Sequence, residues 1–219
     1  MAKRVIDQET WPRRDHFNIF RGFDHPHISL SVNVDITDLW SKRKRLDASP
    51  TTGLVYVLTK AANRLPELRQ RIRGEQVVEH DVMHPLIPIL SSNEMFNPCP
   101  LSYDACFRTF AADAEERIAK AKEHAALDGW PYDEEGNLIR DDLLSITVLP
   151  WLSLTAFSLT RPSEDSIPLL AYGKVLRDGD RDQLPISVNF HHGLVDGLHV
   201  ARFVEFIEEE AKELARDLA

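Results

Sequence analysis

Near its C-terminal end the chain reads Asn189-Phe190-His191-His192-Gly193-Leu194-Val195-Asp196-Gly197-Leu198-His199. The residues before the first histidine, 184–190, predict a strand, and the apolar spacing that follows predicts a helix from about Leu198. A turn that is held at both ends is a suitable place for catalytic side chains. Its histidines suit proton transfer near pH 7, and its glycines permit a tight backbone. The stretch therefore predicts a strand-turn-helix unit that carries a functional site.

Three interpretations of this turn stay open. In the first, a histidine is a general base, and Asp196, four residues after His192, orients the loop or an imidazole. In the second, these two residues bind a metal with His191 and His199, although adjacent histidines point in different directions and no other cluster completes the ligand set. In the third, Asp196 only caps the helix and the histidines are incidental. The residue types favour the general base, and we expect no metal.

The rest of the chain mixes strand and helix patterns. Strands are predicted over residues 27–36, 76–83, 86–90, 144–149, 152–159 and 169–176. Helices are predicted over 37–45 with Thr37 or Asp38 as the cap, from Thr51 or Thr52 to Ala62, from Tyr103 to Asp128, and from Leu198 onward, and a turn over 66–72 is stopped by Gly74. Loops are predicted at 93–100 and 130–142, and a hairpin connection at 177–180. This order predicts an α+β fold with a mixed sheet, in a single domain over residues 1–219.

Composition excludes several classes of function. The formal net charge is -9, which opposes binding to a phosphate backbone, so we expect no nucleic-acid partner. No apolar run approaches the roughly 18 residues of a membrane span, and the first residues lack the apolar core of a secretory signal. The two cysteines, Cys99 and Cys106, have no metal or redox spacing and fit a reducing, cytoplasmic compartment. A 219-residue chain has little room for a separate cofactor domain, so one fold or its oligomer must supply any catalytic site.

The stretch His191–Gly197 matches the HHxxxDG signature of CoA-dependent acyltransferases. Other segments, which occur in the same order along the chain as in one family of these enzymes, show which family the chain resembles. Residues 11–17 resemble the start W-x-R-x-[ED]-H-F of the chloramphenicol acetyltransferase family, and residues 65–69, 81–85, 149–152 and 198–203 resemble four later motifs of that family. The order and spacing of the motifs cover almost the whole chain, so the chain resembles this family throughout its length.

The resemblance implies a two-layer sandwich of a mixed sheet and helices, assembled as a homotrimer with its active sites between subunits. It implies acetyl-CoA as co-substrate and a small hydroxyl acceptor such as chloramphenicol, and so a role in antibiotic resistance. His192 would be the general base, and Asp196 would support the turn through a pair with Arg13. Lys174 and Thr155 would lie near the CoA. The aromatic candidates for the acceptor pocket are, by position, Phe17, Phe20, Phe23, Phe96, Tyr132 and Phe157.

The chain departs from the family pattern where the family has a serine that donates to the oxyanion. Ala156 stands there, and an alanine side chain has no hydrogen to donate. In a strand over 152–159, Ser153 and Thr155 would face away from Ala156, unless a bulge turned Thr155. Ala171 stands at the position of a supporting family threonine, and residues 49–52 replace a family segment near the CoA. The alternatives are therefore a weak or inactive ligand-binding homologue, or an acyltransferase with another acyl donor or acceptor.

Overall fold

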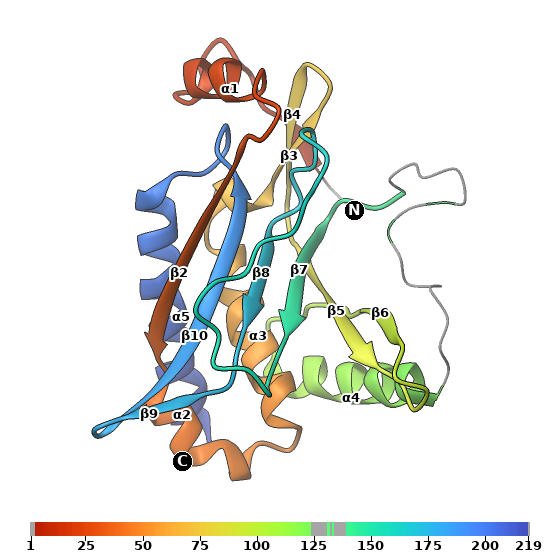
Figure 1. Cartoon of the computed structure of the whole chain (residues 1–219), viewed down its shortest axis with the longest axis vertical. Helices are drawn as coiled ribbons and strands as arrows, with labels where there is room; N and C mark the ends of the chain where they lie inside the picture. Colours follow the sequence, from red (N-terminus) through yellow and green to blue (C-terminus); the bar gives the residue numbers. More distant parts are fainter. Residues whose placement is uncertain (1–2, 124–130, 132, 134–138, 219) are drawn as a thin grey trace.

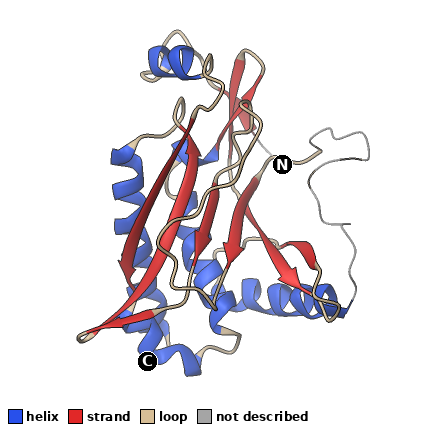
Figure 2. Ribbon diagram, viewed as in Figure 1, coloured by secondary structure: helices blue, strands red, loops and turns tan. Residues whose placement is uncertain are grey.

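The computed structural model describes residues 3–123, 131, 133 and 139–218, which form a three-stranded and a seven-stranded sheet with helices beside the larger one (Figure 1 and Figure 2). The strands are β1 (Lys3–Val5), β2 (His27–Asp35), β3 (Gln70–Arg73), β4 (Gln76–His80), β5 (His84–Leu90), β6 (Phe96–Pro100), β7 (Leu143–Val148), β8 (Leu169–Tyr172), β9 (Leu176–Asp178) and β10 (Arg181–His191). The helices are α1 (Arg14–Phe20), α2 (Thr37–Lys42), α3 (Pro50–Asn63), α4 (Phe107–Glu123) and α5 (Gly197–Asp217), with short 3-10 turns η1 (Arg43–Arg45) and η2 (Pro66–Arg69). The prediction of an α+β fold with a mixed sheet is confirmed.

The large sheet runs in the order β2-β10-β8-β7-β5-β6, and the short strand β9 pairs with the first residues of β10, Arg181 to Gln183. The central pairs β7–β8 and β5–β7 are parallel, whereas the other pairs are antiparallel. β5 and β7 pair only from His84 to Leu86 and then separate, which opens the sheet between them (Figure 1). The smaller sheet, β1-β4-β3, lies beside one end of the large one.

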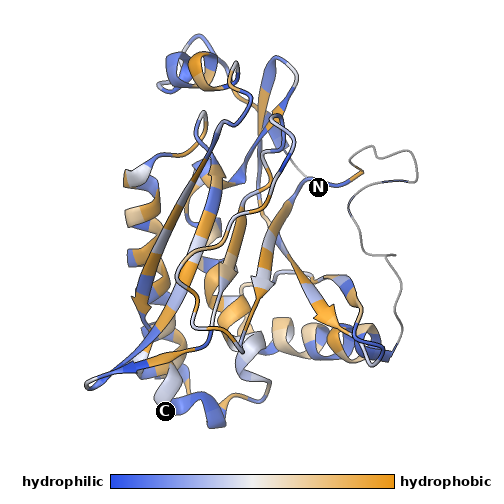
Figure 3. Ribbon diagram, in the orientation of Figure 1, coloured by the Kyte–Doolittle hydropathy of each residue, from blue (hydrophilic) through white to orange (hydrophobic). Residues whose placement is uncertain are grey.

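The alternating sequence of β10 gives the large sheet two different faces (Figure 3). Its apolar residues, Leu184, Ile186, Val188 and Phe190, are at most 1% exposed and belong to the main core with the inner faces of α3 and α5. The residues between them point to the opposite face, because successive side chains alternate along a strand. The segment 149–168, which we call the crossing loop, passes over that opposite face (Figure 1).

The predicted strand over 152–159 is wrong. These residues belong to the crossing loop and form neither helix nor strand. The reason is that β8 is already paired on both sides, by β7 and by β10, so the sheet has no free place next to it. The crossing loop instead makes scattered contacts, including a hydrogen bond from the backbone N–H of Lys174 to the carbonyl of Leu152 at 2.8 Å. Gly173 permits this close passage, since a Cβ there would lie 2.6 Å from Leu154 Cβ.

Several element boundaries also differ from the predictions. Ser49, not Thr51 or Thr52, caps α3, because its hydroxyl accepts from the backbone N–H of Thr52 and Pro50 occupies the first helical position. Residues 70–73 form β3, and Gly74 adopts a positive φ of 59° in the hairpin to β4 rather than ending a helical turn. The predicted loop over 93–100 contains β6. Residues 124–130, which include the predicted end of α4, lie outside the described part of the chain.

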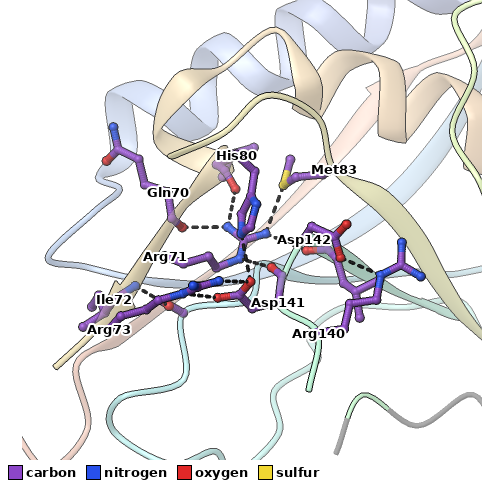
Figure 4. A network of polar contacts seen from close by, with 12 residues as sticks. Gln70, Arg71, Ile72, Arg73, His80, Met83, Arg140, Asp141 and Asp142 are labelled. Carbon is purple, nitrogen blue, oxygen red and sulfur yellow. Dashed lines mark hydrogen bonds and ion pairs between the residues drawn. The ribbon is translucent and has the colours of Figure 1, made fainter. Parts of the chain in front are cut away.

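A buried arginine fixes the beginning of β7. Arg71 is 1% exposed, and its guanidinium donates to the backbone carbonyls of Leu68, Gln70, Asp141 and Leu143 at 2.6–2.7 Å (Figure 4). These bonds satisfy a buried cation without a direct carboxylate partner. They join β3 to the residues that lead into β7, and β7 forms one wall of the opening in the large sheet.

Candidate active site

The turn between β10 and α5 holds His192 in a defined orientation. Its backbone N–H donates to the carbonyl of Pro26 at 2.7 Å, and its ring stacks on that of Phe20, with the ring centroids 4.0 Å apart and the planes inclined by 30°. Nδ1 of His192 lies 2.9 Å from the carbonyl oxygen of Val195. A carbonyl oxygen only accepts hydrogen bonds, so Nδ1 carries the proton and Nε2 of the neutral ring has a free lone pair. The turn therefore presents a nitrogen that can accept a proton.

Arg13 and Asp196 lie 183 positions apart in the sequence and meet at this turn. Arg13 Nη1 lies 2.7 Å from Asp196 Oδ2, and the same guanidinium donates to the backbone carbonyls of His192 and Gly193 at 3.1 and 3.4 Å. Asp196 also caps α5, since its other oxygen accepts from the N–H of Leu198 at 3.0 Å. Arg13 thus ties the segment before α1 to both sides of the turn.

A second histidine completes the cap of α5. The N–H of Asp196 donates to Nδ1 of His199 at 3.1 Å, and Nε2 of His199 lies 3.6 Å from Glu67 in η2. His199 is buried in this arrangement. The Nδ1 atoms of His191, His192 and His199 are each engaged with the backbone, and in the described residues no group of three side chains of the types that ligate metals is placed to bind one ion.

Replacing Arg13 with methionine is expected to destabilise the protein by about 1–2 kcal/mol at pH 7, the lower part of the range for hydrogen bonds to charged groups because Asp196 is 35% exposed. Burial raises the pKa of Asp196, but the bond from Arg13 and the nearby His199 outweigh it and lower the pKa to about 2. A carboxyl whose pKa falls on folding stabilises above its unfolded value, here 3.8, and loses that contribution as the pH falls toward 2.

Urea unfolding at several pH values measures the difference in unfolding free energy between wild type and Arg13→Met. This difference should be largest at neutral pH and shrink between about pH 4 and pH 2. Arg14→Met, a change of the exposed neighbour on α1, is the control and should leave the midpoint unchanged. Equal midpoints for wild type and Arg13→Met at pH 7 would show that the pair of Arg13 with Asp196 does not stabilise the protein.

The aromatic candidates for the acceptor pocket lie in different surroundings. Phe20 stacks on His192 and also packs against the exposed Phe23, with ring centroids 5.4 Å apart. Phe17 is fully buried against Trp11, so its assignment to an acceptor pocket is wrong: it belongs to the core. Phe96 and Phe157 both line the groove between β5 and β7. Tyr132, the sixth candidate, lies outside the described residues.

The opening between β5 and β7 is an apolar groove of about 470 Å³. Side chains from β5, β6, β7 and the crossing loop line it, among them Leu86, Pro88, Phe96, Ser145, Thr147, Trp151, Phe157 and Leu159. A second hollow continues it along the crossing loop as far as Arg161 and Asp165. Two large apolar side chains of the groove itself are exposed, Phe96 at 50% and Trp151 at 67%. A contiguous exposed apolar surface of this kind marks a ligand or protein contact.

The chain matches, from residue 1 to residue 208, the profile of the chloramphenicol acetyltransferases. It belongs to the chloramphenicol acetyltransferase family. Chloramphenicol acetyltransferase 2 of Escherichia coli is 29% identical over 206 residues, which cover 93% of this chain and 94% of that protein. A solved chloramphenicol acetyltransferase superposes with a TM-score of 0.88 at 30% identity, over 96% of this chain and 100% of the other. A dihydrolipoamide acetyltransferase of Azotobacter vinelandii shares the fold, with a TM-score of 0.63 at 17% identity over 94% of this chain and 88% of the other.

Membership of the chloramphenicol acetyltransferase family makes the chain an acyltransferase of a type that uses acetyl-CoA as co-substrate. No helix among the described residues is long and apolar enough to span a membrane. The two positions at which the chain departs from the family pattern lie in different surroundings. Ala156 is exposed in the crossing loop, whereas Ala171 is buried in β8 between Thr147 and Ser187.

The remaining candidates lie at the surface beside β9. Thr155 and Ser153 are exposed in the crossing loop and line a shallow hollow with residues of β2 and β9. Because the crossing loop is not a strand, the argument from alternating faces does not apply to Thr155. Lys174 is exposed in the connection from β8 to β9. Thr155 and Lys174 therefore share one region of the surface, and their role toward CoA stays a prediction.

Sequence reasoning missed a set of polar residues on the sheet face under the crossing loop. Ser187 and Asn189 of β10 are 1% and 4% exposed, and both contact the loop. Arg161 in the loop and His27 in β2 take part in the same arrangement. A signal was present in the sequence, because Ser187, Asn189 and His191 alternate with apolar residues, but alternation by itself indicates an exposed face rather than one covered by a loop.

Proposed function

We propose that this chain transfers an acetyl group from acetyl-CoA to a hydroxyl group of a small acceptor, with His192 as general base. One observation carries the proposal: the bond of His192 Nδ1 to the Val195 carbonyl leaves the lone pair of Nε2 available for a proton. The ring is only partly buried, so a substrate can reach it. Membership of the chloramphenicol acetyltransferase family supports the reaction class.

In the proposed reaction, His192 removes the proton of the acceptor hydroxyl while the hydroxyl oxygen attacks the thioester carbonyl. The new C–O bond converts that carbonyl to an oxyanion. When the oxyanion collapses, the C–S bond breaks and CoA leaves as a thiolate, which takes the proton from the imidazolium. The products are an ester and CoA, and His192 returns to its neutral form. Arg13 and Asp196 hold the turn without exchanging protons with the substrate.

The groove between β5 and β7 suits the acceptor. Its walls are mainly aromatic and aliphatic, and the hydroxyls of Ser145 and Thr147 are the polar groups of β7 that line it. A site of this composition favours a small, largely apolar molecule that carries a hydroxyl, as chloramphenicol does. Chloramphenicol is therefore the first acceptor to test, and a role in antibiotic resistance depends on that result.

A second copy of the chain would complete the site. Within one chain, His192 stacks on Phe20 of α1, whereas Phe96 and Phe157 line the groove between β5 and β7, which none of the residues of α1 or of the turn lines. In the proposed homotrimer of single-domain subunits, His192 of one subunit faces the groove of the next. A closed ring of this kind repeats one heterologous contact three times.

The proposed CoA contact uses the surface that contains Thr155 and Lys174. The net charge of -9 means that the attraction of the CoA phosphates must be local, and Lys174 is an exposed cation there. We further propose that the protein acts in the cytoplasm, since Cys99 and Cys106 are both free thiols.

The proposal is tested with purified protein, acetyl-CoA and a panel of hydroxylated acceptors that includes chloramphenicol. CoA release should depend on the acceptor, and the acceptor should gain one acetyl group. The same panel with propionyl-CoA and butyryl-CoA determines whether another acyl chain is preferred. Absence of acceptor-dependent release with every acyl donor and acceptor would refute the proposed transfer.

The exposed Ala156 favours a second candidate, a homologue that binds its ligands but turns over weakly or not at all. Calorimetry with CoA and with chloramphenicol separates the two candidates. Binding in the micromolar range together with no detectable turnover would support the second candidate, and turnover above the rate without enzyme would exclude it.

A further inference from the structure

Residues 157–161 of the crossing loop, which we call the wall segment, border both hollows on this face of the sheet. Phe157 and Leu159 line the groove between β5 and β7, and Leu159 and Arg161 line the second hollow that continues it. In the described part of the chain, residues 157–161 make no backbone–backbone hydrogen bond. The place of the wall segment therefore depends on hydrogen bonds that involve side chains.

Ser187 of β10 binds the first residue of the wall segment. Its hydroxyl accepts from the backbone N–H of Phe157 at 3.1 Å and donates to the carbonyl of the same residue at 3.0 Å. The same oxygen accepts from the hydroxyl of Ser31 in β2 at 2.9 Å, and Ser187 is 1% exposed. The one donor and both lone pairs of this hydroxyl are thus used, which fixes Phe157 on the sheet.

Arg161 attaches the other end of the wall segment to the same strand. Its Nη1 donates to the backbone carbonyl and to Oδ1 of Asn189 at 3.1 and 3.2 Å. Asn189 is buried and lies two residues after Ser187, so both side chains project from the same face of β10. The wall segment is therefore attached at both of its ends to successive outward positions of β10. Leu159, which borders both hollows, lies between the two attachments.

The remaining donors of Arg161 hold the residues that follow the wall segment. Nε donates to Oδ2 of Asp165 at 3.0 Å, and Nη2 pairs with Oδ1 of the same residue at 2.9 Å and donates to the carbonyl of Ile167. The backbone carbonyl of Asp165 accepts from Nε2 of His27 in β2 at 2.7 Å. The side chain of Arg161 is only 8% exposed. A planar guanidinium presents its donors as a rigid fork, so this one side chain reaches all of these acceptors.

We propose that Arg161 is a positioning residue for the acceptor: by binding Asn189, it keeps Phe157 and Leu159 in place as one wall of the groove. The inference rests on the proposed function, because that function makes the groove the acceptor site. A site that is competent for only part of the time binds its ligand more weakly in proportion to that fraction. Loss of Arg161 should therefore weaken acceptor binding and leave the reaction of the bound acceptor at His192 unchanged.

Steady-state kinetics of three variants test this role. Arg161→Ala should raise KM for the acceptor about 10-fold at nearly constant kcat, as expected when charge-assisted hydrogen bonds to the loop are lost. Arg161→Lys keeps the charge, but its single ammonium cannot reach Asn189, Asp165 and Ile167 together, so its KM should be intermediate. Arg117→Ala is the matched control. Arg117 also pairs with an aspartate four positions away but is 45% exposed on α4, so both constants should stay unchanged.

Chemical rescue with guanidinium chloride separates positioning from a general loss of folding. Arg161 borders the second hollow, so its truncation to alanine leaves a space that opens into this hollow and fits a guanidinium ion. At concentrations far below those that unfold the protein, guanidinium should lower the KM of Arg161→Ala toward that of the wild type. It should leave the wild type and Arg117→Ala unchanged. Sodium chloride at the same ionic strength controls for screening of charges.

Amide hydrogen exchange tests the attachment without any turnover. The N–H of Phe157 donates to Ser187, and the N–H of Ile167 donates to Oδ1 of Asp165 at 3.0 Å. Arg161→Ala should speed exchange at both amides, and guanidinium should slow it again. If the wild type shows no turnover, the proposed function fails, but exchange still decides whether Arg161 holds the wall segment. Unchanged exchange, a wild-type KM, a change in kcat instead of KM, or a raised KM that guanidinium does not lower would overturn the inference.

Discussion

Replacing His192 with glutamine is expected to lower kcat/KM for acetyl transfer by about 10²–10⁴-fold, the range for loss of a positioned general base. Glutamine has a similar length and no basic nitrogen, so the acceptor hydroxyl would keep its proton as it attacks. The turn should survive the change, because Arg13 and Pro26 bind the backbone of residue 192 rather than its ring. Initial rates of CoA release with the best acceptor measure the effect.

Folding of the His192→Gln variant must be shown separately. Its urea midpoint should remain close to that of the wild type, and its affinity for CoA should change little, since the base acts on the acceptor. His16→Gln, a change of an exposed histidine on α1, controls for the chemistry of the substitution. A His192→Gln variant with the rate of the wild type would remove His192 from the mechanism.

Replacing Ala156 with serine is expected to raise kcat by at least about 10-fold, since a single oxyanion donor is worth about 10²–10³ in an enzyme built around it. Ala156 is exposed in the crossing loop, and the next residue is held on Ser187 by both of its backbone groups. A hydroxyl at position 156 would therefore stand on a fixed backbone and face outward, toward the neighbouring subunit of the proposed trimer.

Ser153→Ala is the matched control for this prediction. Ser153 is an exposed hydroxyl in the same loop, and its removal should leave kcat unchanged. If Ala156→Ser does not alter kcat, another group already stabilises the oxyanion. A loss of activity in Ser153→Ala would identify Ser153 as that group.

Much of the fold was predictable because local patterns and final contacts agree. The alternation in β10 and the helical spacing of α5 correspond to buried faces. The alternation in β2 correctly predicts a strand, but of its apolar residues only Val34 is buried. The crossing loop was not predictable, because residues 152–159 have a composition that also occurs in strands. Their structure depends on whether a place in the sheet is free, and β7 and β10 occupy both sides of β8.

Of the candidate site, only the residues of the turn could be predicted from the sequence pattern alone. The residues of the turn are adjacent in sequence, so His192 and Asp196 could be singled out directly, whereas Arg13, 183 positions from Asp196, came only from the resemblance to a family. The burial of Phe17 could not be read from one chain segment, because its partners come from several elements. The contacts of Ser187 and Asn189 depend on the path of the crossing loop, which no local pattern specifies.

The central claim is that His192 of one subunit and the groove of another form one active site. It can be tested by mixing two variants that should each be inactive, His192→Gln and Ser145→Trp, the second filling the groove. After unfolding and refolding together at equal amounts, about a quarter of the sites in random trimers should combine an intact base with an intact groove. Recovery of about a quarter of the wild-type rate of CoA release is the expected result. A mixture as inactive as its components would contradict the claim.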